Sequence, residues 1–186
     1  ESTMRPWLPI ACITLTASLG LATTASSTEG SAAIAGTVDL KRRSSDGPVI
    51  VYVDGDGPAF AAPVQGSVVQ RNRTFAPGSL VVSRDAVVDF PNEDNVLHNV
   101  FSLTPGSEFD LAEYGAGRTR SWVASEAGEI EVYCNRHEDM AMKLLVLPNA
   151  WYAEVDENGG FRIEGVEPGS RTLVAWSASH WEQRLQ

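Results

Sequence analysis

The sequence predicts an all-β protein built as a β-sandwich. Short apolar or alternating runs recur along the chain, and no stretch shows sustained helical periodicity. Turn residues, mainly Gly, Pro, Asn and Asp, separate these runs. The 186 residues are 43% hydrophobic and 20% charged, which is typical of a soluble globular chain long enough to bury a core. We therefore expect one large domain or two small ones.

The N-terminus has the pattern of a secretory signal. Met4 and Arg5 precede the apolar run WLPIACITLTASLGLA, and the small residues TTASS follow it. The run is too short and too rich in threonine for a good membrane span. We expect residues 1–27 to be a signal peptide that directs export to the periplasm, leaving no stable membrane span after cleavage. A lipoprotein signal ending at Cys12 is the alternative, but too little apolar sequence precedes that cysteine.

The expected strands fall into three groups along the remaining chain. The first flank holds AAIAGTVDL and PVIVYVD. The stretch 64–148 is one continuous series, GSVVQ, SLVVS, AVVDF, HNVFSL, SWVAS, EIEVYC and KLLVLP, with a short helical turn expected around Leu111 to Tyr114. The last flank holds WYAEV, FRIEGV and RTLVAW, and the turns DENGG and EPGS between them predict hairpins. Because isolated hairpins are marginal, we expect the two flanks to pack on each other.

The net charge of −10 limits the classes of partner. It argues against nucleic acid and against anionic membrane surfaces, both of which attract basic proteins. It favours solubility and is compatible with a protein partner that presents a basic face.

The segment VYCNRHEDMAM gathers residue types that bind metals. After signal removal, Cys134 is the only cysteine, so it cannot form an internal disulfide. His137 and Met140 follow it in the spacing C-x2-H-x2-M, and His98 lies upstream, directly before Asn99. Each residue alone has an ordinary structural interpretation, as a small core residue, a hydrogen-bonded histidine or a core methionine. Together, a thiolate, two imidazoles and a weak thioether describe a blue-copper centre, and a thioether fits structural zinc poorly.

These motifs resemble those of a known family. The stretch from VVQRNRTF to KLLVLP, roughly residues 64–148, resembles a cupredoxin of the plastocyanin and amicyanin type, in particular plastocyanin-like proteins associated with methylamine utilization. The resemblance implies a Greek-key sandwich with one type 1 copper ion on His98, Cys134, His137 and Met140. It also implies that Asn99 ties the His98 segment to the Cys134 loop. The flanks, residues 31–60 and 149–180, resemble a carboxypeptidase-regulatory-like β-sandwich, split by the cupredoxin domain.

Spacing alone leaves two methionines as the axial ligand. Met140 gives the amicyanin spacing, and Met142 gives C-x2-H-x4-M, the plastocyanin spacing. Resemblance to the amicyanin register, in which a lysine and an apolar strand follow the axial methionine, favours Met140.

Two functional classes compete on the same ligand set. The first is a periplasmic electron carrier that cycles between Cu(I) and Cu(II) and meets redox partner proteins. The second is a copper-binding protein for storage or delivery without an electron-transfer role. A strand-held, largely buried thiolate favours the carrier. We do not expect an enzyme, because three histidines are too few for a multicopper oxidase and no third group orients a Cys134–His137 dyad.

Overall fold

A computed structural model describes residues 16–18, 31–40, 47–178 and 180–185, and within these ranges the chain is built from β-strands, bridges and turns. This confirms the predicted all-β sandwich class. No helix in the described ranges is both long enough and apolar enough to cross a membrane. Most of the predicted signal peptide lies outside these ranges. Its residues 16–18 form strand β1 (Thr16–Ser18), which pairs with β2 (Ala32–Thr37).

The middle of the chain folds into a sandwich of two sheets, called here the central sandwich. One sheet has the order β10-β9-β12-β13-β7 and the other the order β11-β8-β4, while β5 and β6 form a separate hairpin. The strands are β4 (Gly66–Ser67), β5 (Val69–Arg71), β6 (Thr74–Ala76), β7 (Ser79–Ser83), β8 (Val87–Pro91), β9 (Phe101–Ser102), β10 (Phe109–Asp110), β11 (Thr119–Val123), β12 (Gly128–Tyr133) and β13 (Ala141–Leu147).

Both ends of the chain contribute to a second pair of sheets, called here the flanking sandwich. One sheet has the order β14-β3-β16-β17 and the other the order β1-β2-β15. The remaining strands are β3 (Val49–Val53), β14 (Tyr152–Glu154), β15 (Gly160–Val166), β16 (Leu173–Ser177) and β17 (His180–Leu185). Strand β3 pairs with β14 and β16, and β2 pairs with β15, so the segments before and after the central sandwich share both sheets.

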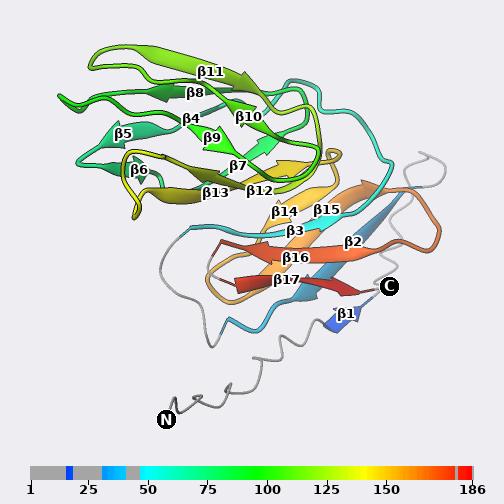
Figure 1. Ribbon diagram of the computed structural model, residues 1–186. Helices are drawn as coiled ribbons and strands as arrows, with labels where there is room; N and C mark the ends of the chain where they lie inside the picture. The colour runs from blue at the N-terminus through cyan, green and yellow to red at the C-terminus, as the bar shows by residue number, and fades with distance from the viewer. Residues whose placement is uncertain (1–15, 19–30, 41–46, 179, 186) are drawn as a thin grey trace, which may run out of the picture.

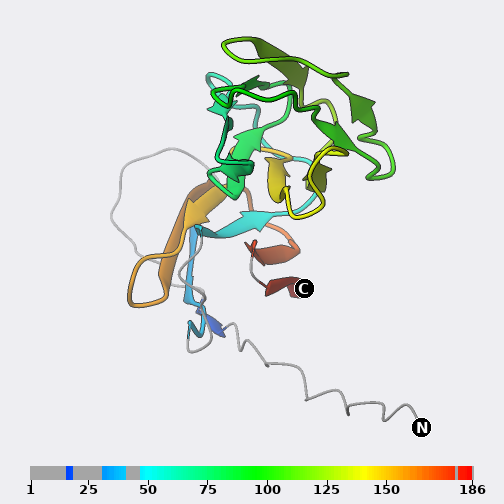
Figure 2. The ribbon, with the colours of Figure 1, turned by 60° about the vertical axis from the view of Figure 1, so that its left-hand side comes forward.

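The four sheets stack, with the two sandwiches packed face to face (Figure 1; a second view is Figure 2). Three apolar cores separate the four layers. One lies inside the central sandwich and one inside the flanking sandwich. The third joins the sandwiches and consists of Ile50, Tyr52, Leu145, Leu147, Val174 and Trp176.

Strand β13 explains why the run KLLVLP is apolar on both of its faces. Because side chains alternate along a strand, successive residues enter different cores. Met142, Leu144 and Val146 pack inside the central sandwich, whereas Leu145 and Leu147 pack against the flanking sandwich. Strand β13 is also paired on both edges, antiparallel to β12 and parallel to β7, so it lies inside its sheet. Burial of both faces is what favours a continuous apolar run.

One carboxylate spans the contact between the sandwiches. Glu129 at the start of β12 accepts hydrogen bonds from Trp176 Nε1 in β16 and from Lys143 Nζ in β13, the latter at 2.7 Å. The indole N–H of the fully buried Trp176 therefore has an acceptor, as a buried polar group requires.

The entry to and exit from the central sandwich meet at one buried side chain. Asn149 donates from Nδ2 to the carbonyl oxygens of Val53 and Gly55, both at 2.9 Å, and its Oδ1 accepts from the amide of Trp151 at 2.9 Å. The amide of Val53 also donates to the Trp151 carbonyl at 2.9 Å. The two chain segments are thus fastened together where the central sandwich begins and ends.

Two local predictions were wrong. The turns DENGG and EPGS do not close hairpins, because β15 pairs with β2 whereas β14 and β16 both pair with β3. These turns carry the chain from one sheet of the flanking sandwich to the other. The expected helical turn at Leu111 to Tyr114 is also absent: Ala112 has a φ of 55°, and Tyr114 forms an antiparallel bridge with His98.

Candidate metal centre

Three of the four predicted ligands lie on the loop between β12 and β13. The antiparallel register of these strands pairs Tyr133 with Ala141 next to the loop. Beyond that pair, the Cys134 amide donates to the Met140 carbonyl at 3.1 Å, and the Met140 amide donates to the His137 carbonyl at 3.0 Å. These two bonds close the loop tightly, so its three candidate donors are held by the ends of two core strands.

The fourth predicted ligand, His98, lies on the segment that leads into β9, the strand that pairs with β12. Its backbone exchanges two hydrogen bonds with Tyr114, at 3.2 and 2.9 Å. The Tyr114 hydroxyl donates in turn to the Phe90 carbonyl in β8 at 2.8 Å and accepts from Gln70 Nε2. Burial raises the pKa of Tyr114 to about 12, so this hydroxyl stays protonated and keeps its role as a donor.

The side chains of His98, Cys134 and His137 converge on one point. The Nδ1 atoms of His98 and His137 are 3.1 Å apart, and Cys134 Sγ lies 3.8 Å from the first and 3.7 Å from the second. All three donor atoms lie within 4.8 Å of one another. Metal bonds of about 2.0–2.3 Å to nitrogen and sulfur span a triangle of this size with one ion at its centre. The residues present therefore fit a metal ion held by two imidazoles and a thiolate.

Burial differs among the four predicted ligands. His98 is 0% exposed, Met140 1% and Cys134 5%, whereas His137 is only partly buried. Burial and the neighbouring His98, Arg73 and Arg136 lower the pKa of His137, which favours the neutral imidazole that binds metals. Three of the four predicted ligands are thus shielded from solvent, and the site reaches the surface through the ring of His137.

Strand register separates the two methionines. Since β12 and β13 pair Val132 with Met142 and Tyr133 with Ala141, the next pair along is Cys134 with Met140. Residues directly opposite in an antiparallel pair project to the same face with Cβ atoms about 4.5–5.5 Å apart, and diagonal neighbours are about 7–8 Å apart. Met140 therefore stands opposite Cys134, and Met142 stands one step farther along the same face.

Asn99 forms the link that the resemblance implies between the His98 segment and the Cys134 loop. Its Oδ1 accepts from the amide of Asn135 at 2.9 Å, directly after Cys134 in the chain. Its Nδ2 donates to Asp110 Oδ1 at 3.2 Å. The segment of His98 and the loop of Cys134 are therefore joined beside the donor triangle, which restricts the movement of both.

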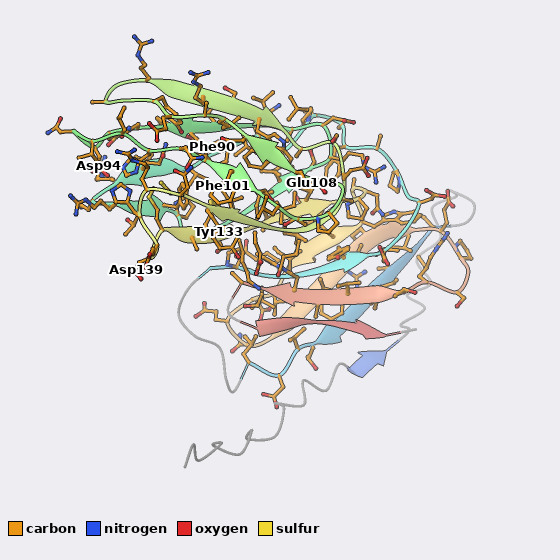
Figure 3. All side chains as sticks on the ribbon, in the orientation of Figure 1. Phe90, Asp94, Phe101, Glu108, Tyr133 and Asp139 are labelled. Atoms are coloured by element: carbon orange, nitrogen blue, oxygen red, sulfur yellow. The ribbon has the colours of Figure 1, made fainter. Side chains whose placement is uncertain are left out.

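Sequence reasoning missed Asp94, whose Oδ2 lies 2.8 Å from His98 Nε2. Burial would raise the pKa of Asp94, but hydrogen bonds from the Arg73 amide, His98 and the Asn72 amide outweigh it and lower the pKa. The sequence signal that could have indicated Asp94 was its position four residues before the candidate ligand His98. Asp94 lies at the same end of the central sandwich as Asp139 of the ligand loop, and Glu108 lies toward the opposite end (Figure 3).

Comparisons with known proteins return partial structural likenesses. No protein-family model matches the chain, and no curated protein matches it. A purple cupredoxin from Nitrosopumilus maritimus is 19% identical, with a TM-score of 0.40, over 44% of this chain and 98% of its own. A mutant of amicyanin, in a reduced Cu(I) form, is 20% identical, with a TM-score of 0.41, over 52% of this chain and 97% of its own. A copper-containing nitrite reductase from Thermus scotoductus SA-01 is 20% identical, with a TM-score of 0.42, over 50% of this chain and 25% of its own.

Proposed function

We propose that the chain binds one copper ion in a type 1 site and serves as an electron carrier. The observation that carries the proposal is the convergence of a buried cysteine sulfur and two histidine Nδ1 atoms within 4.8 Å. A trigonal set of two histidines and one cysteine with a weak axial methionine is the ligand set of blue-copper electron-transfer sites. His98, Cys134 and His137 would hold the ion, with Met140 as the axial ligand. A bound copper ion would supply the one-electron step between Cu(I) and Cu(II).

The protein's own contribution is a fixed and dry environment for these donors. Cys134 and Met140 are fixed by the ends of two paired strands, and His98 is fixed by its bridge to Tyr114. Because the donors are held on several elements of a packed sandwich, they cannot rearrange freely when the charge at the site changes. This rigidity favours a carrier over a delivery protein, whose site would need exposed and exchangeable ligands.

The surface beside His137 is the proposed docking face for redox partners. His137 is the most exposed of the four proposed ligands, and Val96 and Leu97, on the loop that leads to His98, are 36% and 45% exposed. Exposed apolar side chains on the loop that carries a ligand would allow a protein partner to approach and exclude water. The proposed partners are proteins, with no nucleic acid, and the proposed compartment is the periplasm, reached through the N-terminal signal.

We further propose that residues 64–148 form the metal-binding domain and that residues 31–60 and 149–180 form a split module around it. The strand pairing of β3 with β14 and β16 supports this division. The resemblance of the flanks to a carboxypeptidase-regulatory-like sandwich is part of the same proposal.

Copper loading of the purified protein tests the function. We expect one copper per chain, an intense visible absorption from thiolate-to-copper charge transfer, and loss of that absorption in Cys134→Ser. His137→Gln should also lose it, whereas the matched variant His180→Gln, in strand β17 of the flanking sandwich, should retain it. A colourless wild-type protein after copper loading would contradict the proposal. Release of the metal to a mild Cu(I) chelator on reduction would replace the carrier with a delivery protein.

A further inference from the structure

We propose that Asp94 is a positioning residue that presets His98 for metal binding, and that the turn of the β5–β6 hairpin holds Asp94 in place. This inference rests on the proposed metal site and extends it to residues that do not touch the metal. It assigns a role in the site to a hairpin that belongs to neither of the two sheets of the central sandwich.

The hairpin turn presents two backbone amides to one carboxylate. Strands β5 and β6 pair Arg71 with Thr74, so Asn72 and Arg73 form a two-residue turn. Their φ values of 55° and 57° are those of a type I′ turn, the kind that matches the twist of a hairpin. In this conformation the Asn72 amide donates to Asp94 Oδ1 at 2.6 Å and the Arg73 amide donates to Asp94 Oδ2 at 2.8 Å. Each carboxylate oxygen is therefore fixed by a separate bond.

The loop that carries Asp94 is ordered from its other side as well. The Asp94 amide donates to Oδ1 of Asn92 at 2.9 Å, and Asn92 is 0% exposed. Asn92 Nδ2 donates to the carbonyls of Val96 at 2.9 Å and Tyr114 at 3.0 Å. Hydrogen bonds that do not involve His98 therefore hold both the backbone and the side chain of Asp94.

The contact with His98 decides which ring nitrogen carries the proton. An ionised carboxylate can only accept hydrogen bonds, so Asp94 Oδ2 at 2.8 Å requires the proton of His98 on Nε2. The other nitrogen, Nδ1, then has a free lone pair, and it is the atom that lies 3.8 Å from Cys134 Sγ. The His98 side chain is 0% exposed, so no solvent competes for this contact. Partners of this kind raise the basicity of a metal-binding histidine and fix its ring orientation.

Asp94→Asn, compared with Glu93→Gln, is the direct test. Both variants remove one negative charge from adjacent positions, but Glu93 is exposed and pairs with Arg71 rather than with a histidine. Asparagine has one acceptor oxygen, so the variant loses one of the two turn bonds. When that oxygen stays on the Asn72 amide, the NH2 group faces His98 Nε2 and moves the ring proton to Nδ1. We expect Asp94→Asn to weaken copper binding by about 10- to 100-fold and Glu93→Gln to leave it unchanged.

Two readouts separate positioning from a merely structural role. Nitrogen NMR of the metal-free protein should show His98 protonated on Nε2 in the wild type and in Glu93→Gln, whereas Asp94→Asn should populate the Nδ1 tautomer. The reduction potential of the copper-loaded protein should shift in Asp94→Asn alone. A variant that is less stable but keeps the wild-type tautomer, affinity and potential would overturn the proposal.

A second pair of variants tests the hairpin turn and does not depend on Asp94→Asn folding. Arg73→Gly and Arg73→Val both remove the arginine charge, but glycine tolerates a positive φ whereas a β-branched residue resists it. We expect Arg73→Val to weaken copper binding more than Arg73→Gly and to populate the other His98 tautomer. Equal effects of the two substitutions would overturn the role of the turn. If the wild type binds no copper, the proposed function fails, while NMR of the metal-free chain still tests the tautomer.

Discussion

Adjacent leucines in strand β13 provide a test of how the two sandwiches depend on each other. Leu144 and Leu145 are both 0% exposed, but Leu144 packs inside the central sandwich and Leu145 packs against the flanking sandwich. Truncation of a buried leucine to alanine costs about 2–5 kcal/mol, depending on how far the site can collapse. For a chain of this length, about 2–4 °C of melting temperature corresponds to each kcal/mol. Each substitution should therefore lower the melting temperature by about 4–20 °C.

The two variants should perturb different parts of the molecule. In Leu145→Ala, hydrogen exchange should accelerate in β3 and β16 as well as in β13, because the core between the sandwiches is opened. In Leu144→Ala, the visible spectrum of the copper-loaded protein should shift, because this side chain shares a core with Cys134. The measurements are thermal unfolding of the metal-free protein and hydrogen exchange read by mass spectrometry. A loss below about 1 kcal/mol in Leu145→Ala, or unchanged exchange in β3 and β16, would refute a shared core.

Two further predictions concern the metal site and its support. Met140→Leu should keep the visible colour and raise the reduction potential measured by voltammetry, whereas Met142→Leu should alter both little; the reverse result would place the other sulfur at the metal. Tyr114→Phe should lower the free energy of unfolding by about 1–3 kcal/mol in denaturant titrations, because the buried bond to the Phe90 carbonyl is lost. The matched Tyr133→Phe, whose hydroxyl donates to the exposed Glu131, should cost less than about 0.5 kcal/mol, and equal losses would argue against a role for burial.

Local sequence patterns located most of the strands but did not pair them, and β6, β10 and β17 fall outside every expected run. Every expected run contains at least part of a strand, because alternation and turn residues are local properties of the chain. The turn at 156–160 illustrates the limit. It reverses the chain as predicted, with the Asp156 amide donating to the Gly160 carbonyl at 2.8 Å, yet the strands on its two sides join different sheets. Partner choice depends on β2 and β3, which lie far earlier in the chain, on the other side of the central sandwich.

The candidate site shows the same division between local and distant information. Cys134, His137 and Met140 lie close together in the sequence, and the fold brings His98 to them as the motif suggested. Asp94 could not be singled out in this way. Its contact with His98 is local, but the two amides that hold it come from a turn 21 and 22 residues earlier. An acidic residue in a polar loop carries little functional signal in the sequence alone. Its role can be recognised only when the position of the β5–β6 hairpin is known.

The fastening at Asn149 has a consequence for the order in which the chain folds. Asn149 and Val53 are 96 positions apart, and the pairing of β3 with β14 just beyond them closes a very long loop. The entropy lost on closing a loop grows with the logarithm of its length, by about 0.6 kcal/mol for each doubling. A central sandwich that folds first brings its own two ends together and shortens the span that remains to be closed. The strands of the flanking sandwich would then pair across a much shorter span.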